Sequence, residues 1–445
     1  MSITGYIRRK WFWARNSELR NTYDEILNIL GEGKTPKNEQ VIETKTKQLL
    51  THAASTCSYY RQAVGNKSDL QLSDFPIVDK NIINNNRDAF ISSEYAAKGT
   101  KLHYMHTSGS TGTPFEVVQD MGKRSRVIAE IKATNEIVGF PSHEPMMYLL
   151  GWANSDTHRP PYSKKQQFLE NIYRKPVAIN DDNTMLHLAQ FLKKRKIFAI
   201  HSSGSSLQPL LDYIINSSKF SPSDFKLRII ITGGEMIPPS LKADVIRAFG
   251  DKCKCVVKYS NEEMGILAID NGPNTPYKLN VANYHFEVLK LDSDEPADEN
   301  ELGRIVVTDL YNYAMPLIRY DTGDLGIIKE LASGQWPALV DLHGKRRDLI
   351  FTPEGISISG ATITNLLKEV KNVKLYQLIQ EDCNKYCFKV VPTFTNITPT
   401  DDDLLIKELQ TLLGKNAIIR VEITDEIPTI NSQKRRYTVN LYRQK

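Results

Sequence analysis

The sequence predicts an α/β protein with a large N-terminal α/β domain, which has layered sheets and a β subdomain, and a small mobile C-terminal α+β domain. Three observations support this fold class. At 445 residues the chain exceeds one ordinary domain. Strand-length apolar runs alternate with helical stretches in its middle. A second, compact pattern of helices and strands follows a charged run. We therefore expect domains at residues 1–345 and 346–445.

The composition is that of an ordinary folded protein. Hydrophobic residues make up 40% and charged residues 24% of the chain, whereas disordered chains lack the apolar residues needed for burial. The formal net charge of +5 arises from 57 basic and 52 acidic residues. Spread over this length, the excess is too small to indicate nucleic-acid binding.

The first twenty residues are basic and aromatic, but they contain no apolar stretch long enough for a signal peptide or an integral membrane segment. Arg8, Arg9, Lys10 and Arg15 surround aromatic residues there. Contact with a membrane surface is one interpretation, and an amphipathic helix packed on the body is the favoured one. Residues 17–52 then show a helical apolar period that Gly31 and Gly33 interrupt.

The middle of the chain alternates between strand and helix patterns. Apolar runs predict strands, and the stretches between them predict helices; the strands are residues 146–150, 197–200, 227–231 and 255–258, and two of the helices are residues 207–215 and 241–249. Alternation of this kind favours parallel βαβ units. Near-continuous apolar runs indicate a sheet with both faces covered.

Polar residues follow three of these predicted strands directly. They are His201 to Gly204, Thr232 to Glu235, and Tyr259 to Glu263. Open α/β sheets bind ligands at the carboxyl ends of their strands, so we expect the functional site there.

The last third of the chain is built differently. Short β patterns at residues 286–291, 304–308 and 325–329 predict a smaller β subdomain. The charged residues 344–348 predict a hinge. The pattern beyond it predicts helix, strand, strand, helix and strand at residues 361–370, 375–380, 386–391, 404–413 and 417–423.

The five cysteines do not indicate a metal site or a disulfide framework. Cys253 and Cys255 form a C-x-C pair, and Cys383 and Cys387 a C-x3-C pair, neither of which has the C-x2-C spacing favoured by zinc. We expect reduced cysteines and a cytoplasmic protein.

The strongest local signal is the glycine- and hydroxyl-rich stretch from His106 to Pro114. Its glycines permit close backbone approach, and its free amides and hydroxyls can surround a phosphate. It lacks the G-x4-G-K-[ST] pattern of a Walker P-loop, and residues 115–118 after it predict a strand instead of a helix. A Ser/Gly turn between strands is the alternative on composition alone.

This stretch resembles the phosphate-binding signature of the adenylate-forming superfamily, which includes acyl-CoA synthetases, peptide-synthetase adenylation domains and luciferases. The resemblance implies that the chain binds ATP through residues of the stretch, namely Thr107, Ser108, Gly109, Ser110, Thr111 and Gly112.

Two further stretches match that family in the right order. Thr232 to Glu235 resembles the segment that lies against the adenine, which implies nucleotide contacts for Gly233, Gly234 and Glu235. Tyr259 to Glu263 resembles the tyrosine-to-glutamate motif, which implies that Tyr259 stacks on the base and Glu263 helps to hold Mg²⁺. The family usually has Thr where this chain has Glu262, so Glu262 is an alternative metal ligand.

The remaining motifs complete the series. The R-Y-x-T-G-D pattern ends at Asp324, which the resemblance places on the ribose hydroxyls. Lys345 stands where the family's hinge motif typically has Arg, and lysine lacks the planar guanidinium. Lys434 matches the C-terminal catalytic lysine, with Gln433 in place of the usual Gly. The resemblance implies that Lys434 bridges the substrate carboxylate and the α-phosphate.

Within that superfamily the motifs resemble those of the phenylacetate-CoA ligase branch, some of whose members act in capsular or surface polysaccharide synthesis. The resemblance implies formation of an acyl-adenylate and transfer to a thiol, most often coenzyme A; transfer to an amine or hydroxyl, for instance on a sugar, is the alternative. Several members carry a cysteine/histidine zinc site, but residues 268–285 contain no cysteine, so we expect no zinc.

Three questions stay open at this stage. A nucleotide-binding protein without ligase activity is a second hypothesis, because Ser260 also departs from the family pattern. The acyl pocket has no fixed motif, and its candidates are Trp152, His201 and Ser202. The sequence leaves a homodimer open.

Overall fold

The structure is a computed structural model that describes residues 2–96, 99–107, 115–150, 163–176, 181–237, 239–272, 275–367, 370, 373–392, 399–428 and 435–442. The chain divides into two compact units that alternate along the sequence. Unit 1 comprises Met1–Pro145, Ser163–Ile172 and Val256–Asp341. Unit 2 comprises Met146–Tyr162, Tyr173–Cys255 and Leu342–Lys445. The boundary after residue 345 stays a prediction.

Several helices of unit 1 begin after a residue whose side chain caps them. The caps include Ser2 before α1 and Thr35, followed by Pro36, before α3. Gly33 separates α2 from α3 with φ of +83°, a conformation that favours glycine. The helices are α1 (Ile3–Arg15), α2 (Ser17–Glu32), α3 (Pro36–Thr56), α4 (Ser58–Val64), α5 (Lys80–Asn85), α6 (Arg87–Phe90), α7 (Met121–Ile137) and α8 (Lys164–Glu170), with the 3-10 turn η1 (Leu72–Asp74).

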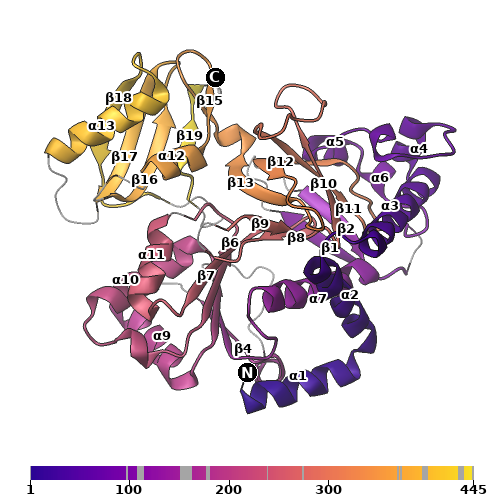
Figure 1. Cartoon of the computed structure of the whole chain (residues 1–445), viewed down its shortest axis with the longest axis horizontal. Helices are drawn as coiled ribbons and strands as arrows, with labels where there is room; N and C mark the ends of the chain where they lie inside the picture. Colours follow the sequence, from indigo (N-terminus) through magenta and orange to yellow (C-terminus); the bar gives the residue numbers. More distant parts are fainter. Residues whose placement is uncertain are drawn as a thin grey trace. The chain divides into compact units, whose positions relative to one another are not determined.

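The strands of unit 1 form a small hairpin and a larger sheet (Figure 1). In the hairpin, β1 (Leu102–Thr107) pairs antiparallel with β2 (Phe115–Asp120), so Thr107 lies opposite Phe115. The strands of the larger sheet run in the order β10, β11, β12, β13, β9, β8 and β7. Their bounds are β7 (Lys254–Asn261), β8 (Gly265–Ile269), β9 (Tyr277–Leu279), β10 (Tyr284–Leu289), β11 (Gly303–Asp309), β12 (Tyr320–Lys329) and β13 (Ala338–Lys345).

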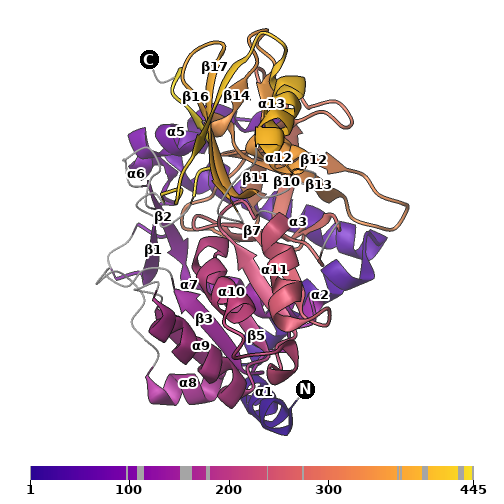
Figure 2. The same cartoon turned by 90° about the vertical axis from the view of Figure 1, so that its left-hand side faces the viewer.

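The first part of unit 2 contains the predicted parallel strands. β3 (Met146–Leu150), β5 (Ala199–Ser202) and β6 (Ile229–Gly233) pair in parallel, and β4 (Ile172–Pro176) is next to β3. The helices α9 (Asp182–Arg195), α10 (Gly204–Asn216) and α11 (Pro239–Phe249) lie together along these strands (Figure 2). They share a buried core in which Leu192, Leu210 and Val245 pack near Ile200 and Ile230. The 3-10 turn η2 (Pro222–Asp224) lies before β6.

The C-terminal part of unit 2 is a compact α+β module. Its sheet has the order β18, β17, β16, β19, and α12 and α13 share one core with it through Ile363, Leu409, Leu378 and Phe388. The elements are η3 (Arg346–Asp348), β14 (Ile350–Phe351), β15 (Ser357–Ile358), α12 (Gly360–Leu366), β16 (Val373–Gln380), β17 (Lys385–Pro392), α13 (Pro399–Leu413), β18 (Ile418–Ile423) and β19 (Thr438–Asn440).

The structure confirms the α/β fold class, the strands that precede the polar clusters and the helical beginning of the chain. It adds β19, a short parallel partner of β16 that the sequence analysis did not predict. The cysteines are free thiols, and all but Cys383 are buried. Among the residues that the structure describes, no helix combines the length and the apolar character needed to cross a bilayer.

Candidate functional site

Two predicted nucleotide ligands of unit 1, Tyr259 and Asp324, lie in direct contact. The Tyr259 hydroxyl donates a hydrogen bond of 3.0 Å to Oδ2 of Asp324. Thr322 fixes the strand beside them, because its Oγ1 donates to the Ile305 carbonyl and accepts from the Asp324 N–H. Burial, together with the charge of Asp324, raises the pKa of Tyr259 well above 10. The phenol therefore stays protonated and acts as a donor that orients the carboxylate.

Glu263, the predicted metal ligand, is buried and held from several sides. Lys80 at the start of α5 places its Nζ 2.8 Å from Oε1 of Glu263. The Tyr320 hydroxyl donates to the same oxygen at 3.1 Å, and the Gln119 amide donates to the Glu263 carbonyl at 3.2 Å. Burial, followed by the charge of Glu263, raises the pKa of Tyr320 well above 10. The neighbouring Glu262 is exposed.

Lys80 is a site residue that the sequence analysis missed. It lies in a segment without a recognised motif, and only the tertiary structure brings it to Glu263. Asp79 caps α5 by accepting a hydrogen bond from the Ile82 N–H at 2.8 Å, which fixes the start of the helix. The only sequence signal was this Asp-Lys pair at the start of a helix.

The phosphate-loop candidate is the connection between β1 and β2. Residues 108–114, including Ser108 to Gly112, lie outside the described part of the chain, and Thr107 is described by its backbone alone. The strand that follows the loop begins at Phe115, whose ring lies parallel to that of Tyr320 with the centroids 6.1 Å apart. Lys80 Nζ is 5.5 Å from the Phe115 centroid. The start of β2, which follows the candidate loop, therefore lies next to Tyr320 and Lys80, which both contact Glu263.

In unit 2, Glu235 connects the predicted adenine segment with the C-terminal lysine loop. Its Oε1 accepts hydrogen bonds from the Ser205 N–H at 2.6 Å and the Ser205 hydroxyl at 2.7 Å. Its Oε2 accepts from the Arg435 N–H at 3.2 Å. Gly234 has φ of +80°, which turns the chain between Gly233 and Glu235. Lys434 is outside the described residues, but the amide that follows it belongs to this contact.

The predicted hinge also meets the lysine loop. Lys345 ends β13 and precedes η3, which contains Asp348. Asp348 forms an ion pair with Arg436, and the Gln377 amide donates to the Arg436 carbonyl at 2.8 Å. The two residues after Lys434 are thus held by Glu235, Asp348 and Gln377.

The acyl-pocket candidates are less well defined. His201 and Ser202 lie at the end of β5, where the His201 ring is 4.5 Å from that of Tyr148 and Ser202 is buried. Trp152 is outside the described residues. The described structure gives His201 an aromatic neighbour, Tyr148, on β3.

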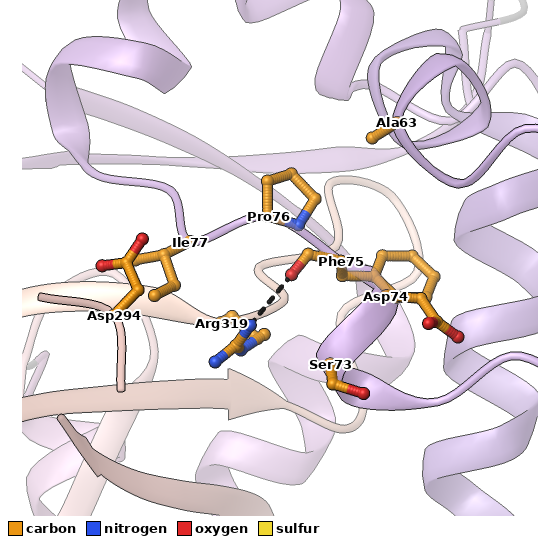
Figure 3. Close-up of a pocket in the computed structure, with 8 residues that line it drawn as sticks. All are labelled: Ala63, Ser73, Asp74, Phe75, Pro76, Ile77, Asp294 and Arg319. Carbon is orange, nitrogen blue, oxygen red and sulfur yellow. Dashed lines mark hydrogen bonds between the residues drawn. The ribbon is translucent and has the colours of Figure 1, made fainter. Parts of the chain in front are cut away.

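A polar cavity of about 340 Å³ lies elsewhere in unit 1 and clarifies the role of Arg319 (Figure 3). Arg319 lines it with Asp294 and the segment around Phe75, to whose carbonyl it donates at 3.2 Å. The same guanidinium pairs with Glu287 at 2.9 Å. Arg319, the first residue of the R-Y-x-T-G-D pattern, therefore stabilises the chain just before β12. Asp324, the last residue of the pattern, contacts Tyr259 instead.

The described residues contain no group of three or more His, Cys, Asp or Glu side chains arranged to hold a metal ion. Glu263 offers one buried carboxylate, bound by Tyr320, whose ring lies against Phe115 at the start of β2. Mg²⁺ in nucleotide sites is commonly held by one or two carboxylates, substrate phosphates and water. The Glu263 carboxylate is therefore of the type that can contribute one ligand to a phosphate-bound Mg²⁺.

This chain is similar to a family model in its C-terminal part and to solved ligase structures over most of its length. Residues 350–441 match the model of the CapK C-terminal domain. The structure of 2-hydroxyisobutyryl-CoA ligase in the postadenylation state, in complex with R3-HIB-AMP, is similar with a TM-score of 0.70 and 16% identity, covering 92% of this chain and 90% of that one. No curated protein sequence gives a significant match.

Shorter parts of two other ligases also superimpose. ATP-bound MatB from Rhodopseudomonas palustris has a TM-score of 0.54 and 15% identity, covering 75% of this chain and 66% of that one. The anthranilate CoA ligase AuaEII in complex with anthranoyl-AMP has a TM-score of 0.52 and 13% identity, covering 76% and 66%. The chain thus has the fold of the adenylate-forming CoA ligases.

Proposed function

We propose that this chain is an AMP-forming ligase that activates a carboxylic acid as an acyl-adenylate and then transfers the acyl group to an acceptor. The observation that carries the proposal is the contact between Tyr259 and Asp324, with Glu263 and its partners in the same unit. These residues come from separate motifs of an ordered series. A chance match of short motifs gives no reason for their side chains to meet.

Asp324 would hold the ribose of ATP. A carboxylate can accept hydrogen bonds from two vicinal hydroxyls, and the Tyr259 hydroxyl keeps this one oriented. The aromatic face of Tyr259 and the backbone of Gly233 and Gly234 would contact the base. Lys345 would supply a point charge near the ribose.

The first half-reaction would be attack of a substrate carboxylate oxygen on the α-phosphorus of ATP. A new P–O bond forms, the bond to the β-phosphate oxygen breaks, and pyrophosphate leaves with its electron pair. Glu263 would hold the Mg²⁺ that neutralises phosphate charge. The amides of residues 108–112 and the ammonium of Lys434 would bind the negative charge that develops. Lys80, whose Nζ pairs with Glu263, would add a further positive charge near the phosphates, beside the Mg²⁺.

The second half-reaction would deliver an acceptor to the adenylate carbonyl. We propose that the C-terminal domain, residues 346–445, turns about the hinge at Lys345 to exchange the residues facing the site. With coenzyme A the thiol would lose its proton and its sulfur would attack the carbonyl carbon; the bond from that carbon to the phosphate oxygen breaks, AMP leaves with the electron pair, and a thioester forms. Both the CoA-ligase fold and the phenylacetate-CoA ligase-like motifs support this acceptor.

An amine or hydroxyl acceptor is the second candidate, and a specific observation favours it. The match of residues 350–441 to the CapK C-terminal domain supports a place in capsule polysaccharide biosynthesis, where the acceptor would be a sugar. The free cysteines and the use of ATP support a cytoplasmic site of action.

The role of Lys434 gives the test of the mechanism. Lys434→Ala should abolish carboxylate-dependent pyrophosphate release and leave transfer from a supplied acyl-adenylate largely intact. Lys407→Ala, an exposed lysine on α13, is the matched control and should change neither rate. Equal loss of both half-reactions in Lys434→Ala would refute the assignment.

The acceptor and the acid need separate assays. A pyrophosphate-release screen over aryl, aliphatic and amino acids identifies the acid, and a product assay that offers coenzyme A beside amino sugars identifies the acceptor. Tight ATP binding without pyrophosphate release across that panel would favour the nucleotide-binding protein without ligase activity.

A further inference from the structure

The N-terminal helix α1 exposes an apolar stripe that no described part of the chain covers. Ile3, Ile7 and Trp11 are 81%, 60% and 44% exposed. Their spacing of four residues places them on one helix face, where the exposed Ala14 also lies. Single exposed apolar residues are common on proteins, but a continuous stripe along one helix marks an interaction surface.

The opposite face of α1 anchors the helix to unit 1. Trp13 is buried against Tyr23, with their ring centroids 4.7 Å apart. Arg9 pairs with Glu136 at 3.0 Å and donates to the Tyr23 hydroxyl at 3.1 Å. Phe12 packs against His143 with a centroid distance of 4.9 Å. These contacts fix the rotation of the helix, so its apolar stripe faces outward.

Cations border the outward stripe on both sides. At 100° per residue, Lys10 falls on one side of the Ile3–Ile7–Trp11 line, and Arg8 and Arg15 fall on the other. α1 contains no Asp or Glu. Arg15 lies over the Trp11 ring at 3.9 Å, and Arg8 lies 4.6 Å from the ring of Phe168 on α8. Phe168 is 64% exposed and extends the apolar surface beyond α1.

We propose that α1 and Phe168 dock the protein onto an anionic lipid surface. A helix that lies in the bilayer interface buries an apolar stripe among the acyl chains, and its flanking Lys and Arg reach the headgroup phosphates. Tryptophan is enriched at that depth. Anionic headgroups complement the cations on both borders of the stripe.

The charge pattern argues against the other occupants of this face. In a two-fold dimer, the same cations from both copies would meet across the apolar stripe and repel one another. A protein partner would need acidic groups along both borders of a narrow groove. A bilayer with anionic lipid meets this requirement over its whole surface.

Co-sedimentation of the full-length protein with vesicles tests the proposal. One vesicle set contains phosphatidylcholine alone, and the other contains phosphatidylcholine with phosphatidylglycerol. We expect binding to the anionic set that weakens as ionic strength rises. Ile7→Asp should weaken this binding roughly tenfold or more, because it places a charge in the apolar stripe. Ile246→Asp, at an exposed isoleucine on α11 of the other unit, is the matched control and should bind like the wild type.

Two further measurements keep the proposal falsifiable. Arg15→Glu should weaken binding to anionic vesicles even if Ile7→Asp fails to fold. Trp11→Phe should remove the blue shift of tryptophan fluorescence on adding vesicles. Equal binding of Ile7→Asp, Arg15→Glu and wild type would overturn the proposal, as would absence of binding by the wild type. A wild-type dimer that Ile7→Asp converts to a monomer would assign the face to self-association instead.

Discussion

Oε2 of Glu235 accepts a hydrogen bond of 3.2 Å from the backbone N–H of Arg435, although the two residues are 200 positions apart in the chain. The contact connects the segment predicted to lie against adenine with the loop that carries Lys434. Ser205 holds the Glu235 carboxylate in place by donating two hydrogen bonds to Oε1. The fixed carboxylate can therefore hold the backbone of the loop in position. We propose that Glu235 acts as a positioning residue for the loop that carries Lys434.

Glu235→Gln should slow adenylation by about tenfold while leaving the KM for ATP nearly unchanged. The substitution removes a charged acceptor from two N–H groups and a hydroxyl, which weakens each hydrogen bond to it. Steady-state pyrophosphate release measures kcat and KM separately. Glu354→Gln, at an exposed glutamate of the same unit, is the control. A rise in KM with kcat unchanged would assign Glu235 to ATP binding alone.

Asp324→Asn should raise the KM for ATP by roughly tenfold or more, because a hydrogen bond to a charged group contributes about 1.5–3 kcal/mol. Tyr259→Phe should have a smaller effect in the same direction, since it frees the carboxylate to rotate. Tyr277→Phe, a half-buried tyrosine on β9, should not change KM. If Asp324→Asn binds ATP like the wild type, the ribose assignment is wrong.

Glu263→Gln should lower the rate of adenylation by about 10²-fold and raise the Mg²⁺ concentration needed for half-maximal activity. The change removes the charge that faces Lys80 and that would hold the metal. Glu262→Gln, at the exposed neighbouring residue, is the control and should leave the Mg²⁺ concentration needed for half-maximal activity unchanged. The opposite pattern would identify Glu262 as the metal ligand.

Local patterns predicted much of this fold because both faces of the central strands are covered. The apolar runs at residues 146–150 and 227–231, which correspond to β3 and β6, could be recognised since burial on both sides requires them to be apolar. Tertiary contacts between distant segments were not predictable. Lys80 reaches Glu263 only because α5 packs near β2, and β19 is too short to show a period of its own.

The sequence identified which residues belong to the candidate site, but it did not predict which of their side chains contact one another. The motifs gave Tyr259 and Asp324, but the hydrogen bond between them depends on β7 and β12, which are not neighbours, belonging to one sheet. Lys258, the residue before Tyr259, also escaped prediction. It is buried within an otherwise apolar run and donates to Asn135 of α7 at 2.8 Å.

Lys258 should make stability rise with pH above 8. Burial lowers its pKa to about 8, whereas an unfolded lysine titrates near 10.5. Between these values the unfolded chain holds one proton more than the folded one, so the lysine contribution grows with pH by about 1–2 kcal/mol between pH 7.5 and 9.5.

The thiols act in the opposite direction over the same range. Burial raises the pKa of Cys57 to about 11 and of Cys253 to about 12, so only the unfolded chain loses these protons near pH 9. Urea unfolding of wild type and Lys258→Met at pH 7.5 and 9.5 isolates the lysine effect. The wild type should gain stability relative to Lys258→Met as pH rises, and a constant difference would show that Lys258 is not titrating.

Carboxylate-dependent exchange of labelled pyrophosphate into ATP tests the central claim most directly, because it requires reversible formation of an acyl-adenylate and no acceptor. With the acid identified by screening, we expect exchange in the wild type, its loss in Lys434→Ala and its retention in Lys407→Ala. ATP binding without exchange for any acid in a broad panel would contradict the account.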